Sequence, residues 1–123
     1  MAKTVLIVDD SKPVRQLITF LLERAGFYVI AAIHGKDALE KFRESKVDIM
    51  ITVLTMPEMD GVELIRTVRT TTSQFIPIVI LTTGAQEAEK QEAWQAGASG
   101  WIKKPFTPAE LVGLVNKLAV QGA

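Results

Sequence analysis

The sequence lacks several features that would point to particular functions. It contains no cysteine, which excludes disulfides, zinc–thiolate sites and thiol catalysis. Its 14 basic and 14 acidic side chains give a formal net charge of zero, without the basic excess that is typical of nucleic-acid-binding domains. No apolar run approaches the roughly 20 residues of a membrane-spanning helix, and no signal segment precedes Val5. We therefore expect a cytoplasmic protein that binds no nucleic acid and inserts into no membrane.

The composition and the hydrophobic pattern predict one α/β domain over residues 1–123. The chain is 48% hydrophobic, which is ample for a single core. Five short apolar runs alternate with helical patterns, and the runs are residues 5–8, 27–30, 49–54, 78–81 and 101–102. They are continuous, which is typical of parallel strands covered on both faces. Alternating strands and helices favour a doubly wound, five-stranded parallel sheet with five helices.

Two acids follow the first predicted strand. Ligands of doubly wound sheets bind outside the carboxyl ends of the strands, and Asp9 and Asp10 stand at that point. Adjacent carboxylates repel each other and need a cation to offset their charge, and magnesium is suited to oxygen ligands of this kind. The alternative is that Asp10 caps the first helix beside Ser11, which is itself a plausible N-cap.

Other polar residues follow the fourth and fifth strands. Thr82 offers a hydroxyl that can donate to a phosphoryl oxygen, and Lys104, before Pro105, offers a positive charge for a phosphate or a carboxylate. Taken singly, Thr82 could cap a turn and Lys104 could be a solvated loop residue. Together with the acids they predict a phosphate site at one edge of the sheet.

The sequence resembles a known family over essentially its whole length. The residues that carry the resemblance are LIVDDS, TMPEMDGVELIR, ILTTGA and AGASGWIKKPF, followed by a terminal helix that opens with a TPAE capping box. They are similar to the receiver domain of two-component response regulators, in particular to the stand-alone type of bacterial chemotaxis. The resemblance implies a flavodoxin-like sheet with strand order 2-1-3-4-5.

The resemblance also implies a chemistry and its residues. In receiver domains an aspartate at the end of the third strand accepts phosphate from a histidine kinase, with Mg²⁺ as cofactor. The implied metal ligands are Asp9, Asp10 and the backbone carbonyl of Thr55. The implied phosphate-pocket and switch residues are Thr82, Thr83, Lys104 and Trp101. Pro105 is expected to follow a cis peptide bond.

One position departs from the family pattern. Counting back four residues from Pro57 places the phosphoacceptor position at Val53, which has no nucleophile. We therefore expect no acyl phosphate there, a weakened affinity for Mg²⁺, and a Lys104 side chain that turns toward Asp9 or Asp10. Burial of valine in place of the acid is worth roughly 1.5–3 kcal/mol, so the chain should be at least as stable as a parent with an acid at this position.

Two accounts of Val53 remain open. The chain is either a natural pseudo-receiver that only binds proteins, or an ordinary receiver whose acceptor has been replaced. The second account is favoured because Asp9, Asp10, Thr82 and Lys104 are all retained. The sequence alone also leaves open whether this is a complete single-domain protein or the receiver of a larger DNA-binding regulator.

The expected partners follow from the same resemblance. They are a histidine kinase and a downstream protein target, bound through the face formed by the fourth helix, the fifth strand and the fifth helix, where Trp94 and Trp101 lie. Trp101 could equally be packed against the sheet edge. We expect a monomer and no enzymatic activity. A magnesium-dependent phosphatase is disfavoured, because such enzymes space their two acids by one residue. His34, the single histidine, is expected to be an ordinary surface residue.

Overall fold

The apolar runs form the strands that the sequence predicts. In the computed structural model, residues 2–71, 75–83 and 87–121 are described. The strands are β1 (Thr4–Val8), β2 (Tyr28–Ala32), β3 (Ile49–Val53), β4 (Ile78–Thr82) and β5 (Gly100–Lys103). The helices are α1 (Lys12–Arg24), α2 (Gly35–Glu44), α3 (Gly61–Thr71), α4 (Glu87–Ala96) and α5 (Pro108–Gln121). None of these helices is long and apolar enough to cross a membrane.

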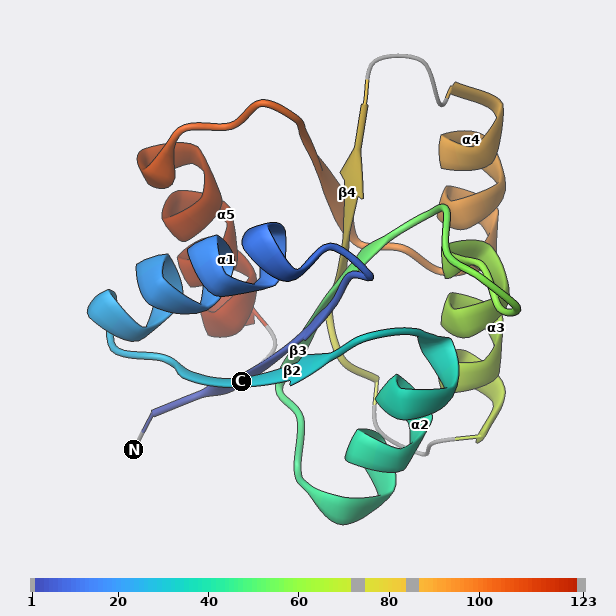
Figure 1. The fold of residues 1–123 in the computed structure, drawn as a ribbon, viewed down its shortest axis with the longest axis horizontal. Helices are drawn as coiled ribbons and strands as arrows, with labels where there is room; N and C mark the ends of the chain where they lie inside the picture. Colours follow the sequence, from blue (N-terminus) through green and yellow to red (C-terminus); the bar gives the residue numbers. More distant parts are fainter. Residues whose placement is uncertain (1, 72–74, 84–86, 122–123) are drawn as a thin grey trace.

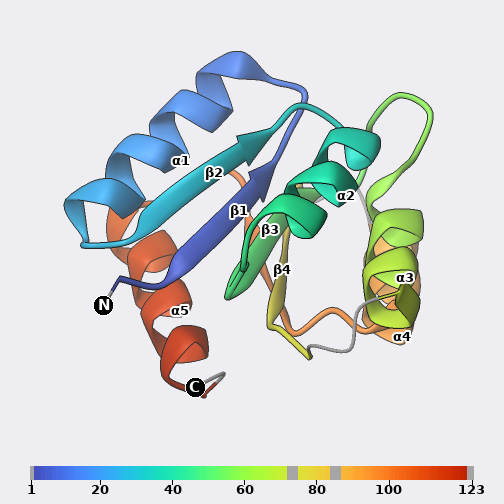
Figure 2. The same cartoon turned by 90° about the horizontal axis from the view of Figure 1, so that it is seen from below.

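The five strands form one parallel sheet in the order β2-β1-β3-β4-β5, which confirms the predicted fold class and strand order. Helices α1 and α5 cover one face of the sheet, and α2, α3 and α4 cover the other (Figures 1 and 2). This three-layer arrangement explains the continuous apolar runs, since a strand between two helical layers has no side that faces water.

Burial separates the central strands from the edge strands. Every residue of β3 and β4 is buried, and so is β1 apart from its first residue. The edge strands β2 and β5 are only partly covered. The core is therefore centred on β1, β3 and β4, and it holds the carboxyl ends of these three strands in fixed positions.

Helix ends agree with the capping signals. The Ser11 hydroxyl accepts a hydrogen bond from the backbone N–H of Val14, at 3.5 Å, and so caps α1. At α5 the Thr107 hydroxyl accepts from the N–H of Glu110, while the Glu110 carboxylate accepts from the N–H of Thr107. These contacts confirm the predicted N-cap and capping box.

The strand register determines which residues meet at the site. Val8 pairs with Thr52, Val53 with Leu81, and Thr82 with Lys103. Asp9, which follows β1, therefore emerges at the level of Val53, and Lys104, which follows β5, lies two residues beyond that level. Asp9, Val53 and Lys104 are brought to one edge of the sheet although they lie far apart in the sequence.

Candidate functional site

A cavity of about 220 Å³ lies at the carboxyl ends of the strands. It is open on one side, and its apolar lining comes from the ends of β3 and β4. Polar groups from the segments after β1, β3, β4 and β5 complete it. The lining residues are Asp9, Asp10, Ser11, Val53, Leu54, Thr55, Leu81, Thr83 and Lys104. The cavity thus brings together most of the residues that the sequence predicts for the site.

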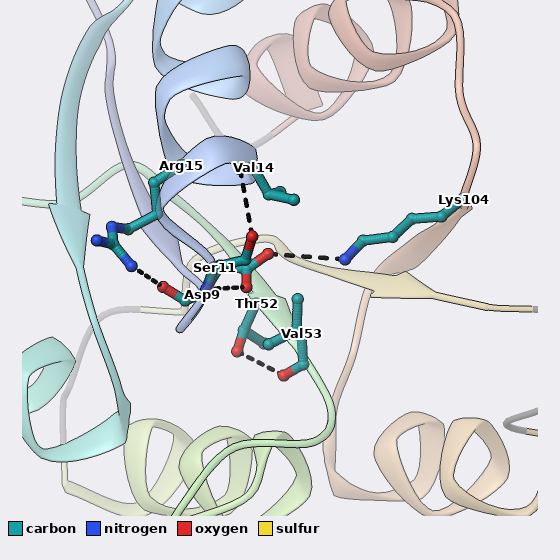
Figure 3. Close-up of polar contacts among 7 residues, drawn as sticks. All are labelled: Asp9, Ser11, Val14, Arg15, Thr52, Val53 and Lys104. Atoms are coloured by element: carbon teal, nitrogen blue, oxygen red, sulfur yellow. Dashed lines mark hydrogen bonds and ion pairs between the residues drawn. The ribbon is translucent and has the colours of Figure 1, made fainter.

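Asp9 is the most deeply buried charged group of the cavity, with 2% of its surface exposed. Its Oδ1 accepts a hydrogen bond from the Ser11 N–H at 2.9 Å. The Arg15 guanidinium donates to the Asp9 carbonyl at 2.7 Å and holds the backbone in place (Figure 3). Burial raises the pKa of Asp9 above its ordinary value of 3.8, and Asp10 adds to the rise, although the Ser11 N–H and Lys104 act in the opposite direction. Asp10 itself is exposed at the rim.

Lys104 reaches across the cavity toward Asp9. Its Nζ lies 3.7 Å from Asp9 Oδ2, and its side chain is 30% exposed (Figure 3). The backbone N–H of Lys104 donates to the Thr82 carbonyl at 2.7 Å, and the bond from Lys104 to Pro105 is cis, as predicted. The predicted turn of Lys104 toward the acid pair is therefore confirmed, with Asp9 as the partner.

Val53 ends β3 and forms part of the apolar lining of the cavity. It is 7% exposed, and its carbonyl accepts a hydrogen bond from the buried Thr52 hydroxyl at 2.8 Å. A Cβ at Gly61 would collide with the same carbonyl oxygen, so the N-terminus of α3 packs directly on the end of β3. Thr52 is absent from the lining, because neighbouring residues of a strand point to opposite faces of the sheet. Position 53 therefore lies at the junction of β3 and α3 and forms part of the wall of the cavity.

The two threonines at the carboxyl end of β4 have different surroundings. Thr82 is buried, and its hydroxyl donates to the carbonyl of Thr83 at 2.8 Å. Thr83 is exposed and lines the cavity, as does Thr55 at the end of the β3 segment. In this conformation Thr83, rather than Thr82, contributes to the wall of the cavity.

The cavity offers a small set of oxygen donors to a magnesium ion. Magnesium prefers near-octahedral oxygen coordination, and the cavity offers the carboxylates of Asp9 and Asp10 beside the Thr55 segment. Among the residues that the structure describes there is no group of three His, Cys, Asp or Glu side chains able to hold a metal ion. Moreover, the open oxygen of Asp9 already faces the Lys104 ammonium.

A second polar cluster supports the site from α2. His34 is the N-cap of α2, and its Nδ1 accepts a hydrogen bond from the Asp37 N–H at 3.1 Å. Gly35 packs so closely against Met59 that a Cβ would lie 2.6 Å from the Met59 sulfur. The start of α2 is therefore held against the loop between β3 and α3. A structural role for His34 was not predicted; its three-residue spacing from Asp37 is the signal that could have indicated it.

Aromatic side chains are exposed on the side of α4 and β5. The rings of Trp94 and Trp101 meet edge to face with centroids 5.4 Å apart, and the Lys90 ammonium lies 4.0 Å from the Trp101 ring centroid. The two tryptophans are 49% and 44% exposed. Trp101 thus packs against α4 side chains and still presents a large apolar surface.

Comparison with known proteins identifies similar sequences and structures. The profile of the family described as "Response regulator receiver domain" matches residues 5–116. The chemotaxis protein CheY of Thermotoga maritima is 37% identical over 120 residues, which cover 97% of this chain and 99% of that protein. The solved structure of Vibrio cholerae CheY4 is 37% identical, covers 96% and 99% of the two chains, and has a TM-score of 0.90.

A second kind of relative is longer than this chain. The transcriptional regulatory protein PhoP of Bacillus subtilis is 35% identical over 118 residues, which cover 96% of this chain and 49% of the relative. The chain thus spans about half the length of this regulator, and nearly all of the chemotaxis protein from Thermotoga maritima.

Proposed function

Because the chain belongs to the response regulator receiver domain family of two-component signalling, we propose that it is a receiver domain in which phosphoryl acceptance is blocked at Val53. Valine has no oxygen that could attack a phosphoryl group, so an acyl phosphate cannot form at this position. On this proposal the domain spans residues 1–123, acts in the cytoplasm as a monomer, and signals by binding. Receiver domains are generally non-enzymatic modules, and we propose no enzymatic activity for this one.

The observation that carries the proposal is the position of Val53, at the end of β3, in the same cavity as two acids and a lysine. Asp9, Asp10, Thr83 and Lys104 surround an apolar side chain at the end of β3. The retained polar groups favour an ordinary receiver with a replaced acceptor over a natural pseudo-receiver. They also leave two acids in place of three, which supports a weakened affinity for Mg²⁺.

The decisive experiment restores the acid. We expect Val53→Asp to be labelled by a small-molecule phosphodonor in the presence of magnesium, while the unchanged chain stays unlabelled. A matched control is Val53→Asn, which is polar but carries no carboxylate. Labelling of Val53→Asp alone also supports a replaced acceptor, because one substitution would then suffice. Absence of labelling in Val53→Asp, once circular dichroism shows that it is folded, would refute the assignment of this cavity.

The partners that we propose are a histidine kinase and a downstream protein target, since receiver domains interact with both. Support for the α4–β5–α5 face as the target-binding surface comes from Trp94 and Trp101, which expose large apolar surfaces next to Lys90. Aromatic side chains of this kind are typical of interface centres. We expect Trp101→Ala to abolish binding to the target, and Tyr28→Ala, a change of an even more exposed aromatic residue on β2, to leave binding unchanged. Binding that survives Trp101→Ala would exclude this face.

A further inference from the structure

The Asp9 carboxylate is buried, yet only one of its two oxygens is hydrogen-bonded within the described residues. Oδ1 accepts from the Ser11 N–H, whereas Oδ2 has no hydrogen-bond partner there. A buried, ionised oxygen is costly unless a positive charge compensates it. The compensating charge is the Lys104 ammonium at 3.7 Å, which is close enough for an ion pair although too far for a hydrogen bond.

The position of Lys104 follows from what surrounds it. Its backbone is fixed by the hydrogen bond to the Thr82 carbonyl, so its side chain extends from a constant point at the end of β5. The side chain at the end of β3, Val53, offers it no charge. The Lys104 ammonium therefore faces the open oxygen of Asp9 across the cavity (Figure 3).

A divalent cation would need the same oxygen. Asp9 lines the cavity together with Asp10 and Thr55, and Oδ2 is the oxygen of its carboxylate that no hydrogen bond engages, so it is the oxygen that Asp9 would offer to a metal. An ammonium and a divalent cation near one oxygen repel each other strongly at this degree of burial. Metal binding would thus require Lys104 to leave Asp9.

We propose that Lys104 is a built-in cation for Asp9, which offsets the charge of this buried carboxylate without a divalent metal and competes with Mg²⁺ for it. This inference rests on the proposed function, because it assigns to Lys104 a task that the loss of the acid at Val53 makes available. It implies that Mg²⁺ binding displaces the Lys104 ammonium from Asp9.

Calorimetric titration with Mg²⁺ alone tests the competition. We expect weak binding to the unchanged chain and an affinity about tenfold higher in Lys104→Ala, because one close positive charge has been removed. The matched control is Lys46→Ala, since Lys46 is an exposed lysine in the loop before β3, at the opposite ends of the strands. Both substitutions change the net charge equally, so a gain in Lys104→Ala alone reports the local contact.

The melting temperature is a second measurement, which separates Mg²⁺ binding from a simple loss of stability in the variant. Mg²⁺ should raise the melting temperature of Lys104→Ala more than that of the unchanged chain, because a ligand that binds only the folded state stabilises it. The double variant Asp9→Asn/Lys104→Met removes both charges and should lose this gain. Equal Mg²⁺ affinity in Lys104→Ala and the unchanged chain would overturn the proposal, as would a gain that persists in the double variant. Either result leaves the labelling test of Val53→Asp unaffected, so the two proposals can fail separately.

Discussion

Asp9 and Asp37 are both carboxylates paired with a lysine, but their surroundings differ. Asp37 accepts hydrogen bonds from the Ile33 N–H and from Lys41 one turn later in α2. The Asp9 carboxylate accepts one hydrogen bond among the described residues, from the Ser11 N–H, and meets Lys104 only at 3.7 Å. Both oxygens of Asp37 are hydrogen-bonded, whereas one oxygen of Asp9 is not.

The pKa values of the two acids differ accordingly. Burial by itself would raise the pKa of Asp37, but the bonds from Ile33 and Lys41 outweigh it, and the pKa is lowered from 3.8. For Asp9 burial prevails and the pKa is raised. Asp37, the carboxylate of the scaffold, therefore stabilises the fold when it is ionised. Asp9, the carboxylate of the cavity, lowers the stability of the fold when it is ionised. A buried acid at a cavity whose pKa is shifted by its surroundings is typical of a functional site.

A further carboxylate added to the cavity should have the largest effect on stability. We expect Val53→Asp to lower the free energy of unfolding by about 3 kcal/mol, because it replaces buried apolar surface with a charge close to Asp9. Urea denaturation without magnesium measures this loss. An unchanged or higher stability would show that the cavity accommodates a second buried acid and would contradict our account of Val53.

Removal of the scaffold carboxylate should have the next largest effect. Asp37→Ala is expected to lower the free energy of unfolding by about 2 kcal/mol at pH 7, because hydrogen bonds to a charged group are lost. Because the pKa of Asp37 is lowered in the folded state, its contribution is present above pH 3.8 and is lost as the pH falls through the folded value. Denaturation curves of the two proteins should therefore converge at acid pH. A difference that stays constant down to pH 3 would exclude an ionic origin.

The cap beside Asp37 should contribute less. His34→Ala removes the side-chain acceptor at the N-terminus of α2 and should cost about 1 kcal/mol, while His34→Asn should retain most of the stability because asparagine is an equally good N-cap. Thermal unfolding of the three proteins at pH 7 compares them. Equal losses in both variants would show that the imidazole stabilises the fold by packing and not by capping.

The smallest effect is expected at Asp9, and it should have the opposite sign. Asp9→Asn keeps an oxygen for the Ser11 N–H and removes a buried charge, so it should slightly raise the free energy of unfolding at pH 7. The raised pKa of Asp9 means that its ionisation destabilises the fold: the favourable contribution is complete below pH 3.8 and is lost as the pH rises through the folded value. The advantage of Asp9→Asn should hence disappear at acid pH. A loss of stability at pH 7 would mean that the contact with Lys104 outweighs the cost of burial.

Much of the fold could be predicted because the sequence repeats one simple pattern. Short continuous apolar runs between amphipathic stretches are compatible with few arrangements other than a parallel sheet between two helical layers. Strand ends were less certain, since β2 reaches Ala32 and β5 begins at Gly100. At these edges the burial that marks a strand is incomplete, so the apolar run and the hydrogen-bonded strand differ in length.

Part of the candidate site could also be predicted from the sequence. Asp9, Val53 and Lys104 could be expected to meet because the carboxyl ends of parallel strands lie at one edge. The contact of Arg15 with the Asp9 carbonyl could not be predicted, and neither could the edge-to-face packing of Trp94 on Trp101. Both depend on how a helix is placed against a loop or a strand, and no periodicity in the sequence encodes that placement.

By itself, the sequence determined the chemistry that is available: two adjacent acids, a lysine before a proline, and a valine at the end of the third apolar run. The tertiary structure decided how those groups are paired. It directed Lys104 to the open oxygen of Asp9 and gave that carboxylate a raised pKa. The reason is physical. The sequence specifies which side chains are present, whereas their pairing and burial depend on separations of a few ångströms between groups that lie far apart in the chain.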